Sequence, residues 1–272
     1  MRDHEPVKTT QYLTDEFSDE AVAFIERHKK EPFFLYLSYN APHGPLQATE
    51  EYLARFSHIK DEKRRTYAAM VSALDDGVIR VLDQLEREGI TENTLVFFLS
   101  DNGGCGPSWG SSNGELNGRK GEVWEGGYRV PFAFQWKGEI PQGMVYDQPV
   151  SALDIYATIA EFAQVEAKKP LDGVNIVPYL KGEKEGAPHE ALYTRIYDYQ
   201  SYAVRSGHWK LRVGGGEMPP ELYDLSLDIG EKEDLAQEKE AKVQELLELK
   251  RAWDQELIEP TFEGLRHRKK KK

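Results

Sequence analysis

The fold is decided by a ten-residue stretch, Leu95-Val96-Phe97-Phe98-Leu99-Ser100-Asp101-Asn102-Gly103-Gly104. Its first five residues form a short continuous apolar run, which predicts a strand buried on both faces, as in a parallel sheet. Its last five residues are polar or glycine, so the strand is expected to end there in a tight turn. In open parallel sheets, ligands bind outside the carboxyl ends of the strands. This turn is therefore the first candidate for a functional site.

The sequence before this stretch predicts a strand and two helices. Residues 33–37 form another continuous apolar run, flanked by turn residues, and predict a second strand covered on both faces. Residues 62–88 carry apolar residues at three- and four-residue steps, the strongest helical pattern in the chain. Residues 17–28 predict a further helix with Ser18 as its N-cap. Strand, helix and strand in this order predict an α/β fold with a mostly parallel sheet.

The pattern changes after the turn-rich segment at 181–187. Before it, a strand near 130–136 and a helix at about 152–162 extend the α/β pattern. After it, short strands at turn-separated spacing and one helix predict a small antiparallel sheet with a covering helix. These elements are expected at 191–197, 202–213, 221–225 and 238–256.

Three regions follow from this change of pattern. Residues 1–186 are expected to belong to the α/β domain, and residues 187–260 to a small antiparallel α+β subdomain. Residues 261–272 include a block of arginine and lysine, which predicts a disordered, solvated tail.

Composition limits the classes of function. The 272 residues carry a net charge of −12, so nonspecific attraction to nucleic acid or to anionic membranes is not expected. No apolar run approaches the ~18 to 20 residues that a membrane span needs. The chain's one cysteine, Cys105, excludes an internal disulfide framework. Residues 1–6 are polar and charged, so no signal peptide is expected at this end.

Asp101 and Asn102 are candidate metal ligands. Their side-chain oxygens follow one another on a glycine turn, and both could reach a hard cation such as calcium or magnesium. The alternative is a purely structural turn, because Asp and Asn side chains also bond nearby backbone amides. Two oxygens leave most of a six-fold shell to other residues.

Lys120 and His43 are candidate groups for an anionic substrate. Lys120 lies in a glycine-rich loop, where its ammonium could stabilise charge on a leaving oxygen; the alternative is a surface lysine. Arg129 is expected to pin this loop through carboxylates such as Glu125. His43 lies in a proline-rich loop after residues 33–37, and its imidazole could transfer a proton near neutral pH, or it is only a loop residue.

Together these residues resemble a known family. The chain contains Ala-Pro-His at 41–43, Ser-Asp-Asn-Gly-Gly at 100–104, and Lys-Gly-x-x-x-Glu-Gly-Gly-x-Arg-Val-Pro at 120–131. This order resembles the type I sulfatases (arylsulfatase or N-acetylgalactosamine-6-sulfatase-like) of the alkaline-phosphatase-like superfamily. Later stretches resemble the same family as far as about residue 258. These stretches are 151–159, 171–174, 203–211 and 221–225.

The resemblance implies a fold and a set of roles. The fold would be the alkaline-phosphatase-like sandwich, incomplete at its N-terminus, plus the small C-terminal sheet. Asp101 and Asn102 would ligate calcium or magnesium, Lys120 would contact the sulfate ester and its leaving oxygen, and His43 would help with proton transfer and sulfate binding. The nucleophile would be a formylglycine hydrate made from a Cys/Ser-x-Pro-x-Arg motif.

The sequence departs from the family at its N-terminal end. The formylglycine motif, an aspartate pair and a sulfate-binding lysine and histidine would all precede His43, and none is among the 42 residues there. The segment starting at Cys105 nearly repeats the motif, but Trp109 stands where arginine is required. Asp75 and Asp76 are expected on a solvated helix face. The chain is therefore interpreted as the C-terminal part of a sulfatase and is expected to be inactive alone.

The expected function is hydrolysis of a sulfuric ester, on a sulfate ester small molecule or a sulfated glycan. The glycan is suggested by the resemblance and by Trp109 and Trp124, which could stack on sugars or serve only in packing. The alternatives are a phosphodiesterase or phosphonate monoester hydrolase of the same superfamily, and a noncatalytic fragment. A full-length parent is expected to be periplasmic or secreted; neither nucleic acid nor membrane is an expected partner.

Overall fold

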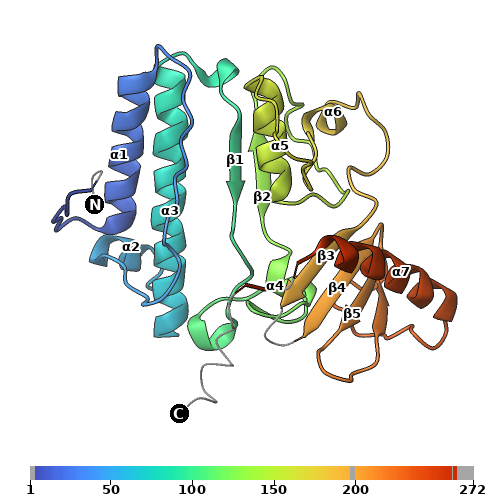
Figure 1. Ribbon diagram of the computed structural model, residues 1–272. Coiled ribbons are helices and arrows are strands. Elements are labelled where there is room, and N and C mark those ends of the chain that lie inside the picture. Colours follow the sequence, from blue (N-terminus) through green and yellow to red (C-terminus); the bar gives the residue numbers. More distant parts are fainter. Residues whose placement is uncertain (1–3, 197–199, 259, 262–272) are drawn as a thin grey trace. The chain divides into compact units, whose positions relative to one another are not determined.

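The computed structural model describes residues 4–196, 200–258 and 260–261 (Figure 1). Most of the basic tail expected at 261–272 lies outside these residues. The chain divides into two compact units, which are described separately. Unit 1 comprises Met1–Val96, Cys105–Ser112 and Trp136–Gly138; unit 2 comprises Phe97–Gly104, Asn113–Gln135 and Glu139–Lys272. None of the helices in the described ranges is both long and apolar enough to cross a bilayer.

Unit 1 is built on three helices, α1 (Leu13–His28), α2 (Glu50–Arg55) and α3 (Glu62–Arg87). Helices α1 and α3 lie side by side (Figure 1). Helix α3 begins where the sequence predicts it, because the Asp61 side chain accepts a hydrogen bond from the Arg64 backbone N–H. Two short 3₁₀ turns, η1 (Thr91–Asn93) and η2 (Pro107–Trp109), also belong to this unit.

The prediction of Ser18 as the N-cap of the first helix is wrong. Helix α1 begins at Leu13, and Ser18 is fully buried inside it. Its hydroxyl donates to Thr14 O at 2.8 Å and lies 2.8 Å from the Tyr39 hydroxyl. A Cβ on Gly77 of α3 would lie 2.4 Å from Ser18 Oγ, so the two helices approach closely at this point. Ser18 is a residue of the helix contact.

The apolar run at 33–37 is extended, but it is not assigned as a strand. Phe34 and Tyr36 are 69% and 79% exposed, so the expectation of a strand covered on both faces is wrong for the described chain. Exposure alternates along the run, because successive side chains of an extended backbone point to opposite sides.

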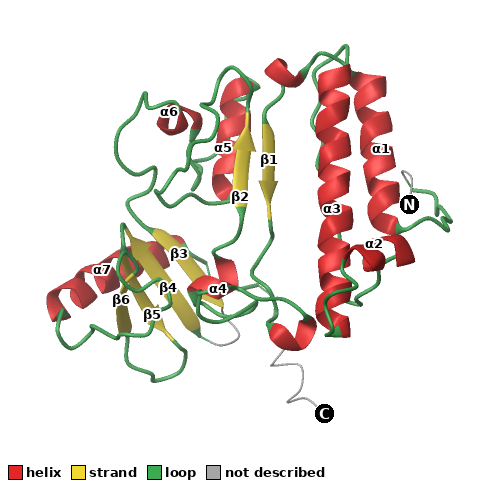
Figure 2. Cartoon of the chain, turned by 180° about the vertical axis from the view of Figure 1, so that it is seen from behind, coloured by secondary structure: helices red, strands yellow, loops and turns green. Residues whose placement is uncertain are grey.

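Unit 2 contains most of strand β1 (Val96–Leu99), which pairs with β2 (Phe132–Gln135) in a two-stranded sheet. Figure 2 shows the two strands running in opposite directions. The mostly parallel sheet expected of the α/β portion is therefore not found among the described strands, whose pairings are antiparallel. Strand β1 is only half-buried, with Phe98 40% exposed, so its expected burial on both faces is also wrong.

The C-terminal part of unit 2 confirms the small antiparallel sheet with one covering helix. The strands pair in chain order and helix α7 (Glu240–Glu256) contacts β4 and β5 (Figure 1). The predicted strand at 202–213 is a hairpin of two strands, because the chain turns at Gly207 with φ of +56°. The strands are β3 (Leu192–Ile196), β4 (Ser201–Ser206), β5 (Trp209–Val213) and β6 (Glu221–Asp224).

The core of this sheet is apolar and faces α7. Val204 pairs with Leu211, and Leu211 pairs with Leu222, so the three side chains share one face. They pack against Val243 and Leu246 of α7. Three further helices complete unit 2: α4 (Glu125–Tyr128), α5 (Leu153–Phe162) and α6 (Val177–Leu180).

Candidate functional site

Asp101 and Asn102 lie where β1 ends, as the sequence predicts. The Asp101 carboxylate is exposed and makes no hydrogen bond or ion pair within the described residues. The Asn102 amide nitrogen donates to Gly103 O at 3.0 Å, which leaves the amide oxygen available. Ser100 Oγ donates to Asn102 O at 2.9 Å and fixes the turn. The turn therefore leaves side-chain oxygens of both residues free to accept a cation.

The loop that carries Lys120 is joined to this turn by backbone hydrogen bonds. Gly103 N donates to Gly127 O at 3.0 Å, and Lys120 N donates to Gly104 O at 3.1 Å. A Cβ on Gly103 would lie 1.8 Å from Gly126 O, so only glycine allows the two segments to meet. The structure thus brings together three predicted residues, Asp101, Asn102 and Lys120.

The Lys120 ammonium has no partner among the residues that the structure describes. The side chain is exposed, and within the described residues it makes no hydrogen bond or ion pair. Gly118 and Gly121 on either side have φ of +76° and +84°, a backbone region that favours glycine. A lysine held by its main chain and free at its ammonium can approach an anion without first breaking a salt bridge.

Asn113 organises this loop, a role that the sequence does not predict. Its amide oxygen accepts from Gly104 N at 2.8 Å, and its amide nitrogen donates to Gly118 O at 2.9 Å. One side chain thereby ties the strand-end turn to the start of the Lys120 loop. The only signal in the sequence is an amide residue in a glycine-rich stretch, which is also ordinary loop composition.

His43 belongs to unit 1, in the loop that follows the extended run. Its Nδ1 lies 2.8 Å from Gly44 O. A carbonyl oxygen can only accept, so Nδ1 carries a hydrogen in this contact, and in the neutral ring Nε2 is then the acceptor. His43 is exposed. Its proximity to Lys120, which belongs to unit 2, stays a prediction.

Trp109 lies against the His43 loop within unit 1. A Cβ on Gly44 would lie 3.1 Å from the Trp109 ring. The turn that carries Trp109 is anchored to α3, because Lys63 Nζ donates to Ser108 O at 3.1 Å and Arg64 donates to Gly110 O at 2.7 Å. Trp109 is 55% exposed. The structure thus presents an indole ring on a fixed turn beside His43.

Trp124 serves in packing. The Arg212 guanidinium lies 3.6 Å from the centre of the indole ring, and the Tyr223 ring lies 5.7 Å away. A Cβ on Gly118 would lie 2.5 Å from Trp124 Cβ. Of the two tryptophans that could stack on a sugar, Trp109 has the exposed ring.

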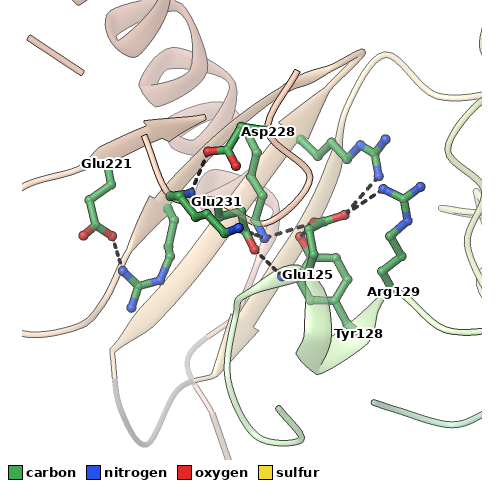
Figure 3. Close-up of polar contacts among 10 residues, drawn as sticks. Glu125, Tyr128, Arg129, Glu221, Asp228 and Glu231 are labelled. Atoms are coloured by element: carbon green, nitrogen blue, oxygen red, sulfur yellow. Dashed lines mark hydrogen bonds and ion pairs between the residues drawn. The ribbon is translucent and has the colours of Figure 1, made fainter. Parts of the chain in front are cut away.

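Glu125 anchors the C-terminal end of the Lys120 loop in a buried polar cluster (Figure 3). Arg129 lies 3.5 Å from Glu125, which confirms the expectation that it pins the loop through this carboxylate. Arg205 approaches the same oxygen at 3.4 Å, and Lys210 and Tyr128 approach the other at 3.0 and 2.8 Å. Glu125 and Lys210 are both fully buried.

The pKa values of two carboxylates in this cluster are shifted in opposite directions. Burial alone would raise the pKa of Glu125, but the charges of Lys210 and Arg205 and the hydrogen bonds from Lys210 and Tyr128 hold this pKa below its ordinary value. Burial raises the pKa of Glu231 above its ordinary value, although Lys210 and the Glu125 backbone N–H oppose the shift. Of the two carboxylates, Glu125 is therefore the one whose charged form its neighbours favour.

The residues present fit part of a hard-cation site. Asp101 and Asn102 supply oxygen ligands, the type that calcium and magnesium prefer. The described residues hold no group of three or more His, Cys, Asp or Glu side chains that could bind a metal. Asp76 is bonded to Arg55 at 2.7 Å and Asp75 is exposed, in agreement with a solvated helix face.

Comparison with known proteins gives the same family over most of the chain. A family model described as Sulfatase matches residues 1–165, and one described as N-sulphoglucosamine sulphohydrolase, C-terminal, matches residues 119–256. The uncharacterized sulfatase YdeN of Escherichia coli K12 is 36% identical over 240 residues, 83% of this chain and 42% of YdeN. Mouse steryl-sulfatase is 32% identical over 275 residues, 87% of this chain and 43% of that protein.

A solved structure gives the same result for the fold. Ps i-CgsB, in complex with k-i-k-neocarrahexaose, superposes with a TM-score of 0.89 at 38% identity, covering 96% of this chain and 58% of that chain. The chain spans less than half the length of YdeN and of mouse steryl-sulfatase. The α/β class and the family expected from the motifs are both confirmed. The chain belongs to the type I sulfatases of the alkaline-phosphatase-like superfamily.

Proposed function

We propose that the protein hydrolyses sulfuric esters, with this chain supplying part of the metal site and the lysine that contacts the sulfate ester. The observation that carries the proposal is the joining of the Asp101–Asn102 turn to the Lys120 loop by two backbone hydrogen bonds, from Gly103 N to Gly127 O and from Lys120 N to Gly104 O. Free oxygens and a free ammonium held on one frame suit an anionic ester.

Asp101 and Asn102 would hold calcium or magnesium through their side-chain oxygens. Such an ion, when bound, polarises the sulfate group and offsets its charge. The two residues supply a minority of the six to eight oxygens that calcium takes. Other ligands, including the aspartate pair known from the family, would come from the portion that the longer relatives carry in addition.

Lys120 would contact the sulfate ester and stabilise negative charge on the leaving oxygen. Its ammonium is unpaired within the described residues, so it is available for this contact. His43 would hold the sulfate and transfer a proton through Nε2, because Nδ1 is bonded to Gly44 O.

The attacking group would be formylglycine, supplied outside this chain's 272 residues. Cys105 is not proposed for that role, because Trp109 stands where the modification motif requires arginine. The isolated chain is therefore expected to be inactive towards sulfate esters. The expected periplasmic or secreted location of a full-length parent stays a prediction.

The proposed substrate is a sulfated oligosaccharide. Ps i-CgsB, which is 38% identical, has been solved in complex with k-i-k-neocarrahexaose. In this chain the exposed Trp109 ring beside the His43 loop offers an apolar face of the kind on which sugar rings stack.

The proposal is tested by completing the fold. The chain is joined to the portion of Ps i-CgsB that it does not cover and is produced with formylglycine conversion. Sulfate release is then assayed from 4-nitrophenyl sulfate and from sulfated oligosaccharides. Lys120→Ala should lower kcat by about 10² to 10³, the cost of removing one preorganised charge-stabilising group. Lys169→Ala, at another exposed lysine, is the matched control.

Two results would contradict the proposal. One is preferential hydrolysis of bis(4-nitrophenyl) phosphate, which would indicate a phosphodiesterase. The other is an unchanged rate in Lys120→Ala. Hydrolysis by the isolated chain that disappears in Cys105→Ala would overturn the exclusion of that cysteine.

A further inference from the structure

The Lys120 loop is held from its far end by the small antiparallel sheet. Five residues after Lys120, Glu125 begins the short helix α4 and is completely buried. Its nearest cation is Lys210 of β5, which is also completely buried. Glu231, in the segment after β6, is 3% exposed and completes the group. Partners 85 and 106 residues further along the chain therefore meet at one point of the loop.

Lys210 contacts the side chain of Glu125, and Glu231 accepts a hydrogen bond from its main chain (Figure 3). Lys210 Nζ lies 3.0 Å from Glu125 Oε1 and 2.6 Å from Glu231 Oε1. The second oxygen of Glu231 accepts from the Glu125 backbone N–H at 2.8 Å. One ammonium between two carboxylates thus fixes the direction of the chain where the Lys120 loop ends.

The loop is also fixed at its start, which is tied both to the strand-end turn and to the residue after Glu125. Lys120 N donates to Gly104 O, and Gly126 N donates to Asn117 O at 2.7 Å. Between these points Gly121 has φ of +84°, and the Lys120 side chain has no partner of its own within the described residues. The position of the ammonium therefore depends on the two anchors, and Lys210 is the buried cation of the second one.

The chemistry of the anchor points to a role in placement. Taking charged groups out of water costs several kcal/mol per ion, and well-packed apolar residues of similar volume often stabilise a fold as well or better. Ionic groups, however, fix direction in a way that apolar contacts do not, because each hydrogen bond specifies an angle. Here five charged groups, Glu125, Glu231, Lys210, Arg205 and Arg129, meet at the base of a loop whose tip carries Lys120.

We propose that Lys210 is a positioning residue for Lys120, acting through Glu125 with Glu231 as its second partner. The small antiparallel sheet thereby sets the geometry of the sulfate-ester site without contacting the substrate. The role assigned to Lys120 rests on the proposed function; the mechanical link between Lys210 and the loop does not.

The test compares hydrogen exchange of backbone amides in Lys210→Met, Glu231→Gln and Lys250→Met with that of the unsubstituted chain. Lys250 is the matched control, since it pairs with Asp254 and lies 4.4 Å from the centre of the Tyr202 ring in the same subdomain. Exchange is followed at residues 117–127 and at residues 201–206 of β4, well below the unfolding temperature. Lys210→Met should accelerate exchange at 117–127 by about tenfold or more, because a local anchor is lost, while 201–206 stays unchanged.

Lys210→Arg should restore most of the protection, because it keeps the charge, and Lys250→Met should show none of the effect. If Lys210→Met fails to fold, Glu231→Gln serves instead; it keeps an acceptor for the Glu125 N–H and should accelerate loop exchange to a smaller extent. Unchanged exchange at 117–127 in the folded variants would overturn the proposal. Equal acceleration at 201–206 would also overturn it, because Lys210 would then only stabilise the subdomain.

A second measurement separates this inference from the proposed function. Binding of inorganic sulfate in the presence of calcium is titrated calorimetrically, using the completed enzyme. If sulfate fails to bind while loop exchange still responds to Lys210, the role of Lys120 is wrong and the positioning contact stands. If sulfate binds equally well in Lys210→Met and in the unsubstituted enzyme, Lys210 does not position Lys120 for the anion.

Discussion

Gly103 and Gly126 cross so closely that a Cβ on Gly103 would lie 1.8 Å from the Gly126 carbonyl oxygen. Gly103→Ala should therefore separate the Asp101–Asn102 turn from the Lys120 loop. We expect a loss of about 3 kcal/mol or more in the free energy of unfolding, because the neighbour is backbone and cannot rotate away. Urea unfolding measures the loss. Gly214→Ala is the control, since a Cβ there would meet the flexible ends of Arg212 and Met218, and an equal loss in both variants would contradict the prediction.

Calcium binding to the chain should depend on Asp101. With two oxygen ligands, affinity should be weak, with Kd on the order of 10⁻³ M. Asp101→Ala should abolish the heat of binding in a calorimetric titration, because it removes the only formal charge of the pair. Asp75→Ala, an exposed aspartate in unit 1, is the control. Identical titrations of the Asp101 and Asp75 variants would show that calcium binds elsewhere.

Removing the Glu125 charge should lower the free energy of unfolding by an amount that depends on pH. Glu125→Gln removes the charge of one of the two carboxylates that face buried Lys210 and should lower the free energy of unfolding at pH 7 by about 3 to 5 kcal/mol. The folded pKa of Glu125 lies below its ordinary value of 4.5, so its contribution is complete above that value and is lost as the pH falls through the folded pKa. The difference between the two proteins should therefore shrink in acid. Glu139→Gln, at a surface pair with Lys181, should cost at most about 1 kcal/mol.

The contribution of Glu231 to stability should change with pH in the opposite direction. Its folded pKa is raised above 4.5, so its contribution is complete below the ordinary value and is lost as the pH rises through the folded pKa. Glu231→Gln should remove this loss, so that the stability of the variant depends less steeply on pH just above 4.5. The pH dependence of the urea midpoint measures the change. A steeper dependence in the variant would contradict the assignment.

Trp109→Ala should weaken binding of a sulfated oligosaccharide to the completed enzyme, with little change in kcat for 4-nitrophenyl sulfate. The loss of one stacking contact should amount to about 0.5 to 1.5 kcal/mol, roughly 2- to 13-fold in Kd. Trp109→Phe should retain part of the affinity. Trp253→Phe, which alters a ring stacked on Tyr193 in the small subdomain, should change nothing. Equal oligosaccharide affinity in Trp109→Ala would remove Trp109 from the site.

The sequence was sufficient for the parts of the site that follow one another locally. An apolar run ending in Asp-Asn-Gly-Gly predicts a strand and the turn after it, and Asp101 and Asn102 lie there. Lys120 lies in the glycine-rich loop that the sequence indicates, and Gly118 and Gly121 of this loop have positive φ. Helix α3 is found within one residue of its predicted bounds because its apolar period is strong over the whole length.

The remainder depends on contacts between residues distant in the sequence. Nothing near Lys210 indicates that its ammonium is buried between Glu125 and Glu231, because such pairing has no local pattern. Serine is a residue type that often caps helices, yet Ser18 lies inside a helix and contacts Thr14 and Tyr39.

The hydrogen bond from Lys120 N to Gly104 O has a thermodynamic consequence. A cation at Asp101 and an anion at Lys120 would each order the same short frame of glycines, so neither could bind without changing the affinity for the other. Thermodynamic linkage requires this effect to be reciprocal: the factor by which calcium tightens sulfate binding equals the factor by which sulfate tightens calcium binding. In a completed enzyme, measured affinity for either ion alone would then understate the affinity that operates when both are present.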